Sequence, residues 1–219
     1  MSWTIERFHE APSASHARAL PAEPTRSIWV FEPTVPALVL GSAQQIDVPP
    51  GAVEVVRRRS GGGAVLVVPG EVLWIDVLLP AGDPLWEDDV GHAFGWLGAV
   101  WAAALASLGV ATTVHEGAMR RSPWSDTVCF AGVGPGELLN QSGEKVLGLA
   151  QRRTRSAARF QCVALARWDA DAVAGMLGLS PPAGVDLRGV AAGVGVPMDR
   201  LLEAFVAALP GGAGGGRPT

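Results

Sequence analysis

One stretch of nine residues decides how this chain is interpreted: it reads Arg57-Arg58-Arg59-Ser60-Gly61-Gly62-Gly63-Ala64-Val65. Three successive glycines between two valine-rich segments remove every side chain from a turn. Backbone N–H groups can then approach an anion closely, and the arginines beside them supply positive charge. A glycine-rich hairpin with solvated arginines is the alternative. The pattern is no Walker A loop, since no Gly-Lys-Ser/Thr follows, and no dinucleotide fingerprint, whose glycine spacing differs.

The composition of the 219 residues is that of a globular protein. Hydrophobic residues make up 48% and charged residues 17%, which is sufficient for a sizeable core. The formal net charge of −4 argues against a nucleic-acid-binding surface. Asp76 interrupts the longest apolar run and the N-terminus does not resemble a signal peptide, so we expect no membrane partner. Two cysteines, Cys129 and Cys162, are too few for a disulfide framework, and we expect a cytoplasmic protein.

The expected secondary structure mixes strands and helices without a strict βαβ alternation. Segments rich in valine and leucine indicate strands at 28–31, 37–40, 53–57, 64–68, 72–79, 110–114, 127–130, 137–140, 145–151 and 160–165. An apolar stripe predicts a helix from Val90 to Leu108, with Val90, Phe94, Leu97, Trp101 and Leu105 buried against the sheet. Two further helices are expected at 170–177 and 198–209, and residues 1–25 show no clear period. The sequence therefore predicts one α+β domain over residues 1–209, a mixed β-sheet flanked by helices, followed by a disordered glycine-rich tail at 210–219.

Lysine is almost absent from the chain. Of the 17 basic residues 16 are arginine, and Lys145 is the one lysine. Such a bias is typical of a GC-rich coding sequence. The single lysine is either retained by chance or marks a position where a compact ammonium is needed and a planar guanidinium will not serve.

Three ordered motifs resemble a known family. Arg58 to Val65 closely resembles the Arg-Arg-x-Ser-Gly-Gly-Gly-Ala-Val loop of lipoate–protein ligase A and its relatives. Upstream, Pro36 to Gln44 is similar to the strand of that family that leads into a Gly-x-x-Gln turn. Downstream, Gly143 to Gln151 is similar to its Gly-x-Lys-Val-x-Gly-x-Ala-Gln segment. Three motifs in order are far more specific than one, and they imply the fold of the biotinyl/lipoyl-protein ligase catalytic domain.

The resemblance also implies site residues. Lys145 matches the lysine that approaches the reacting carbonyl and phosphate oxygens, where a fixed ammonium stabilises developing negative charge. Val128-Cys129-Phe130 is similar to the segment that carries the nucleophile of cysteine-dependent octanoyltransferases, although a buried core cysteine is the alternative. The residues implied in acyl or nucleotide binding are Arg58, Ser60, Gly61, Gly62, Gly63, Ala64, Val65, Glu137 and Gly148.

The chain departs from the family pattern at two motifs, and the Asn-x-x-x-Asp/Glu segment usual near the N-terminus of the family has no clear counterpart. Leu66-Val67-Val68 stands where the family usually has an aromatic or aliphatic residue and then His-Asp, and Gln161-Cys162 stands where many members have His-Gly. None of the four histidines lies in a recognised motif, so we expect the proton-transfer or pocket-shaping role of those family histidines to be absent. The chain ends before the accessory domain of the longer ligases, so a catalytic domain alone is expected.

The sequence thus predicts an enzyme that attaches a lipoyl or octanoyl group to a lysine of a lipoyl carrier domain or a glycine cleavage H-type protein. In one route ATP and magnesium activate free lipoate or octanoate as its adenylate, and the spelling of the glycine loop favours this route. In the other, an octanoyl thioester passes through Cys129 without ATP. A non-catalytic acyl- or nucleotide-binding homologue is the third alternative. No metal site made by protein side chains is expected.

Overall fold

The computed structural model describes residues 2–48, 53–179 and 186–211. Its strands are β1 (Thr4–Glu10), β2 (Ser27–Pro33), β3 (Ala37–Leu40), β4 (Glu54–Arg57), β5 (Val65–Val67), β6 (Val72–Pro80), β7 (Thr113–Val114), β8 (Leu138–Leu139), β9 (Lys145–Arg153) and β10 (Ala157–Leu165). Its helices are α1 (Pro12–Ala17), α2 (Gly95–Ser107), α3 (Ala170–Met176), α5 (Met198–Ala208) and the 3-10 helix η1 (Cys129–Ala131).

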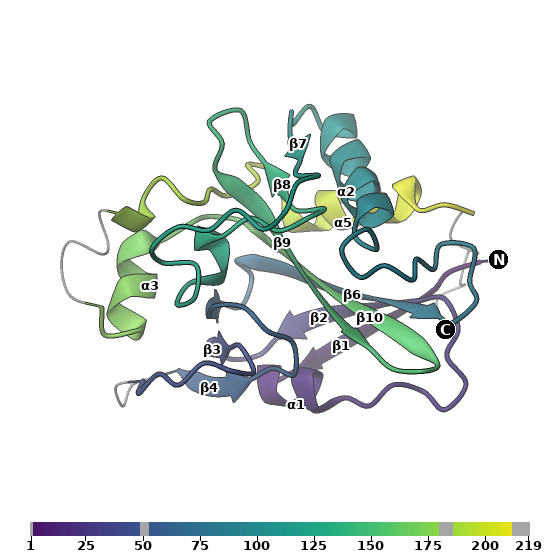
Figure 1. Ribbon diagram of the computed structural model, residues 1–219, viewed down its shortest axis with the longest axis horizontal. Coiled ribbons are helices and arrows are strands. Elements are labelled where there is room, and N and C mark those ends of the chain that lie inside the picture. The colour runs from purple at the N-terminus through teal and green to yellow at the C-terminus, as the bar shows by residue number, and fades with distance from the viewer. Residues whose placement is uncertain (1, 49–52, 180–185, 212–219) are drawn as a thin grey trace.

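The strands form two mixed sheets. The large sheet has the order β1-β2-β6-β10-β9-β8-β7 and the small sheet the order β4-β3-β5. The pairs β1/β2 and β3/β4 are parallel, and the remaining pairs are antiparallel. In Figure 1, α2 and α5 lie together on one side of the large sheet, and the small sheet and α1 lie on the other. The predicted α+β architecture with a mixed sheet is confirmed.

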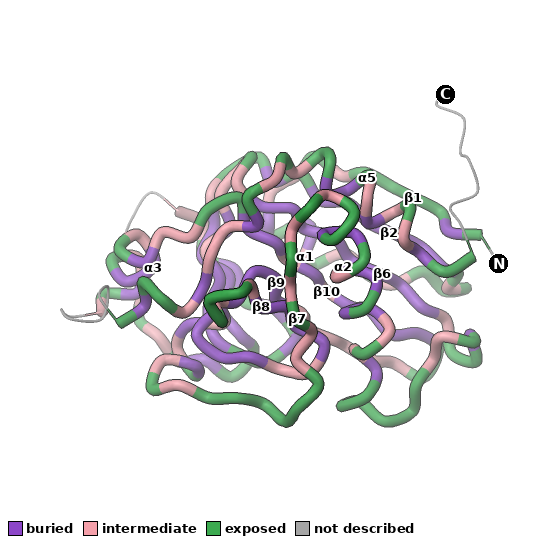
Figure 2. Tube along the Cα trace, turned by 90° about the horizontal axis from the view of Figure 1, so that it is seen from above, coloured by how far each residue is buried: buried purple, intermediate pink, exposed green. Residues whose placement is uncertain are grey.

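Strand β6 shows how sequence alternation builds the core. Leu73, Ile75, Val77 and Leu79 point to one face, where they pack with α2 and α5 in the main hydrophobic core. On the opposite face Trp74 packs with aromatic residues of β2 in a separate cluster. The strand is buried on both faces, and Figure 2 shows buried segments through the middle of the molecule.

Helix α2 begins later than the apolar stripe predicts. It starts at Gly95, and Val90 lies before it with 55% of its surface exposed, so the expectation that Val90 belongs to the core is wrong. The Asp89 carboxylate accepts hydrogen bonds from the backbone N–H groups of Gly91 (2.7 Å) and His92 (3.2 Å), which holds these residues in a turn. Leu97 is fully buried in the helix, as predicted.

Two other segments differ from the expected pattern. Residues 4–10 form the edge strand β1 and residues 12–17 form α1, where no regular element was predicted. The expected strand at 127–130 is a single bridge between Val128 and Ala64, after which the chain coils into η1. The predicted tail comprises residues 210–219. Of these only Pro210 and Gly211 are described, and residues 212–219 lie outside the described residues.

Pro210 ties the end of the described chain to its beginning. Its carbonyl accepts hydrogen bonds from the Trp3 indole (3.0 Å) and from the Arg26 guanidinium (3.4 Å). Arg26 in turn forms a buried two-point ion pair with Asp83, with both N···O distances at 2.6 Å. Hydrogen bonds and an ion pair therefore connect segments that are far apart in the sequence.

Candidate functional site

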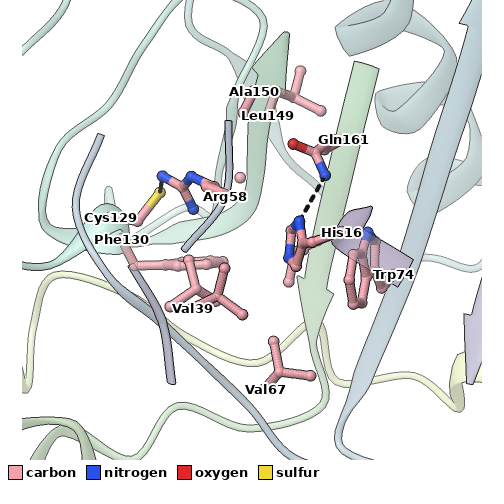
Figure 3. A pocket seen from close by; sticks show the side chains of 13 residues that line it. His16, Val39, Arg58, Val67, Trp74, Cys129, Phe130, Leu149, Ala150 and Gln161 are labelled. Carbon is pink, nitrogen blue, oxygen red and sulfur yellow. Dashed lines mark hydrogen bonds between the residues drawn. The ribbon is translucent and has the colours of Figure 1, made fainter. Parts of the chain in front are cut away.

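An apolar cavity lies between the two sheets. The small sheet contributes Val39, Val65 and Val67, and the large sheet contributes Trp74 and residues of β9 and β10. Figure 3 shows these side chains around the space, with His16 on one wall and Arg58 beside Cys129 on another. A slot with hydrocarbon walls suits an alkyl chain.

A second cavity, the polar cavity, adjoins it. The glycine loop lines this second space together with Lys145 and Glu137. Both cavities share Arg58, Cys129 and two residues of β9, so they meet where the guanidinium and the thiol lie. The combined space is apolar at one end and polar at the other.

The glycine loop is not a hairpin, because β4 and β5 lie on opposite sides of β3. A Cβ on Gly63 would lie 2.5 Å from the backbone N of Cys129 and the backbone C of Val128, and Gly62 has φ +96°, which favours glycine. Gly61, in contrast, has open space within 4 Å of such a Cβ. Two of the three glycines are therefore required by the backbone, and they place the loop directly against the segment that carries Cys129.

Arg58 lies buried at the junction of the two cavities, with 7% of its surface exposed. Its Nη2 donates hydrogen bonds to the carbonyls of Gly61 (2.7 Å) and Gly63 (3.0 Å) and lies 3.9 Å from Cys129 Sγ. No carboxylate of the described residues forms an ion pair with it. Buried charges in proteins are normally paired, so a guanidinium in this environment could pair with an anionic group.

Lys145 lies at the start of β9, with its side chain 1% exposed. Its Nζ forms an ion pair with Glu137 at 2.6 Å and donates to the carbonyls of Cys129 (3.1 Å) and Gly132 (3.0 Å). The Glu137 carboxylate also accepts from the backbone N–H groups of Gly134 (2.7 Å) and Leu149 (2.9 Å). All three ammonium protons thus face acceptors of the protein, and the pair fastens the segment 129–134 to β9.

The two cysteines differ in environment. Cys129 is half-buried and lines both cavities, beside the Arg58 guanidinium. Cys162 is fully buried in the main core, and burial raises the pKa of its thiol. Only Cys129 is therefore placed where a thiolate could meet a ligand.

Most of the remaining predicted site residues line one of the two cavities. Ser60 lines the polar cavity, whereas Val65 and Gly148 line the apolar one. Ala64 lines neither, because its backbone pairs with the segment 127–129. Within the described residues no group of three or more histidine, cysteine, aspartate or glutamate side chains could hold a metal.

His16 is a cavity residue that sequence reasoning missed. It stands on α1, and its ring lies against Trp74 with centroids 4.6 Å apart. Arg159 holds this helix in place by donating to the carbonyls of Ser15 and Arg18, both at 3.0 Å, while it forms a buried ion pair with Asp76. His16 lies in no recognised motif, and the six-residue helix that carries it is too short to show a helical periodicity in the sequence.

The His16 imidazole is neutral. Burial, and then the positive charges of Arg159 and Arg58, lower its pKa from 6.5 to about 3. Its Nδ1 lies 3.5 Å from the side-chain nitrogen of Gln161, whose oxygen accepts from Ser60 Oγ at 3.1 Å. A line of polar groups therefore runs from the glycine loop to α1 along the cavity wall.

Comparison with protein families decides the relationship of this chain, because residues 13–205 match the lipoyl protein ligase A/B catalytic domain. The chain belongs to this family. Membership covers most of the sequence, including the glycine loop, the Cys129 segment and the Lys145 segment. A comparison with curated proteins finds no match. None of the helices in the described ranges is long and apolar enough to cross a lipid bilayer.

Solved structures share the fold of this family member. The bi-partite lipoate protein ligase of Thermoplasma acidophilum, studied with its E2 lipoyl domain, has a TM-score of 0.71 at 16% identity over 95% of this chain and 82% of its own. Protein Ta0514 of T. acidophilum with bound lipoic acid gives 0.69 at 16% identity over 95% and 84%. Lipoate-protein ligase A bound with ATP gives 0.64 at 15% identity over 95% and 84%. At these identities the likeness is one of fold.

Proposed function

We propose that this chain is a lipoate–protein ligase-like enzyme that attaches a lipoyl or octanoyl group to a lysine of a carrier domain through an acyl-adenylate. One observation carries the proposal: the buried Arg58 has no carboxylate partner among the described residues and lies where an apolar cavity meets a polar one. An acid with an alkyl tail matches this arrangement, tail in the apolar space and anionic end at the guanidinium.

The polar cavity then receives the nucleotide. The Gly61–Gly63 backbone and Ser60 line it, and a magnesium ion would come bound to the triphosphate of ATP, since the described residues offer no cluster of metal ligands. ATP, lipoic acid and an E2 lipoyl domain each occur with a structure of the same fold, which supports these as cofactor, substrate and partner. A glycine cleavage H-type protein is a second acceptor of the same kind.

Lys145 has a conditional role in this proposal. Because its three protons already face Glu137 and two carbonyls, the ammonium reaches an acyl oxygen only by exchanging the carbonyl of Cys129 or Gly132 for it. Such an exchange would bring a buried positive charge to the oxygen as negative charge develops there. We place the whole activity in one domain, residues 1–209.

The position of Cys129 favours one alternative, transfer without ATP. Its sulfur lies 3.9 Å from Nη2 of Arg58, and it lines both cavities. In that route the thiolate attacks the carbonyl of an octanoyl thioester, and the carrier thiol leaves with its electron pair and takes up a proton. The acceptor lysine then attacks the new thioester and releases Cys129.

One experiment separates the routes. The purified protein is incubated with lipoate, MgATP and a lipoyl domain, and separately with octanoyl carrier protein, and products are followed by mass spectrometry. The adenylate route gives lipoyl-AMP and a lipoylated acceptor, and Cys129→Ser keeps most of that activity. The thioester route gives an octanoyl adduct on the enzyme that Cys129→Ser abolishes. An Arg58→Met variant as active as the wild type in both assays would overturn the proposal.

A further inference from the structure

The apolar cavity has one wall that is not apolar. His16 and Gln161 line this cavity but not the polar one, and Figure 3 shows His16 on the wall opposite Arg58. Their neighbours on the wall are Trp74 of β6 and Val163 of β10. An unsubstituted alkyl chain offers no hydrogen-bonding partner to the polar atoms of His16 and Gln161, and burying such atoms against hydrocarbon is unfavourable.

The hydrogen bonds fix which proton His16 presents. Ser60 Oγ donates to the Gln161 oxygen, so the Gln161 amide group turns its NH₂ toward His16. His16 Nδ1 therefore accepts, and the proton of the neutral ring resides on Nε2. In Figure 3 this second nitrogen of His16 points into the cavity, away from Gln161. Among the described residues the ring has its one hydrogen bond with Gln161, so its Nε2–H is available to a ligand.

We propose that His16, oriented by Gln161, is a specificity-determining residue that selects an acyl chain bearing sulfur, the dithiolane of a lipoyl group, over an unsubstituted octanoyl chain. The inference rests on the proposed function and names the substrate within it. A dithiolane sulfur is a weak acceptor for Nε2–H and a polarisable neighbour for the Trp74 ring, whereas a methylene leaves the donor without a partner. An unpaired buried donor corresponds to roughly a tenfold preference for lipoate.

Binding measurements on the full chain test the proposal. The dissociation constants of lipoate and octanoate are measured by calorimetry for wild type, His16→Leu and His16→Gln. We expect the wild type to bind lipoate about tenfold more tightly. His16→Leu should bring the two constants together by weakening lipoate and strengthening octanoate, and His16→Gln, which keeps an N–H donor, should retain part of the preference. His9→Leu is the matched control, because His9 is exposed on β1 and should leave the ratio unchanged.

Each outcome bears on a different claim. A His16→Leu variant with the wild-type ratio of the two constants overturns the role of His16, even where both acids bind well. Equal weakening of both acids, with a lowered melting temperature, also overturns it, because His16 then acts only as a packing residue under α1. If the wild type binds neither acid, the proposed function itself fails, and the inference fails with it.

Discussion

Replacing Lys145 by methionine separates the structural work of the Lys145–Glu137 pair from its chemistry. Both side chains are 5% exposed or less, and methionine keeps an unbranched apolar stem beside Phe130 while removing the charge. Glu137 is then left as a buried carboxylate without its cation, and the carbonyls of Cys129 and Gly132 lose a donor. Breaking a buried pair from one side costs about 3–5 kcal/mol of the free energy of unfolding.

Urea and thermal unfolding, followed by the fluorescence of the eight tryptophans, measure this cost. At 2–4 °C per kcal/mol for a chain of this size, the melting temperature should fall by roughly 6–20 °C. Glu137→Gln and the double variant complete a thermodynamic cycle, in which we expect a coupling free energy of roughly 1–3 kcal/mol. Surface ion pairs contribute less than about 1 kcal/mol. A loss below that value for Lys145→Met would refute the conclusion that the buried Lys145–Glu137 pair holds the segment 129–134 against β9.

The same variants report on chemistry at a temperature where all are folded. If the ammonium exchanges a carbonyl for the acyl oxygen, Lys145→Met loses on the order of 10²–10³ in acyl-transfer rate. The double variant should regain stability without regaining activity. Recovery of both together would mean that Lys145 serves the fold alone.

Three other changes follow from the packing and charges. Leu97→Ala should lower the free energy of unfolding by about 2–5 kcal/mol, whereas Val90→Ala should change it by no more than about 0.5 kcal/mol, both by urea titration. Gly63→Ala should cost roughly 1–3 kcal/mol from backbone overlap and Gly61→Ala nearly nothing, and equal effects would contradict the loop geometry. Between pH 6.5 and about 3 the unfolded chain protonates His16 and the native chain does not, so stability falls as pH falls; His16→Leu should flatten this dependence in parallel unfolding curves.

Local pattern predicted most of the scaffold and the position of the glycine loop. Residues 72–79 are almost all apolar, and a strand of this kind can be recognised in the sequence without knowing which strands lie beside it. Edge strand β1 could not be found in this way, because it is largely exposed and is defined by parallel pairing with β2, about twenty residues later. The sequence predicts too early a start for helix α2, because Val90 fits the helical period of the residues that follow it. In the structure, Asp89 holds that region in a turn.

The site was predicted in part, for a related reason. Ser60, the glycines, Cys129 and Lys145 lie within contiguous motifs, and the structure brings them around one polar cavity. The environment of Lys145 could not be predicted, because its acceptors come from a loop whose path depends on the pair itself. His16 reaches the cavity only because Arg159, over 140 residues away in sequence, fastens α1 there.

The bond from the Trp3 indole to the Pro210 carbonyl has a consequence for biosynthesis. The two residues are 207 positions apart, and a ribosome adds about 5–20 residues per second. Trp3 therefore waits roughly 10–40 s after its own synthesis before its partner exists. In the first part of that interval, until residue 80 is made, β2 also lacks its partner β6, and the nascent chain presents an aromatic, strand-forming segment to chaperones. Slower translation would lengthen this exposure without altering the stability of the finished protein.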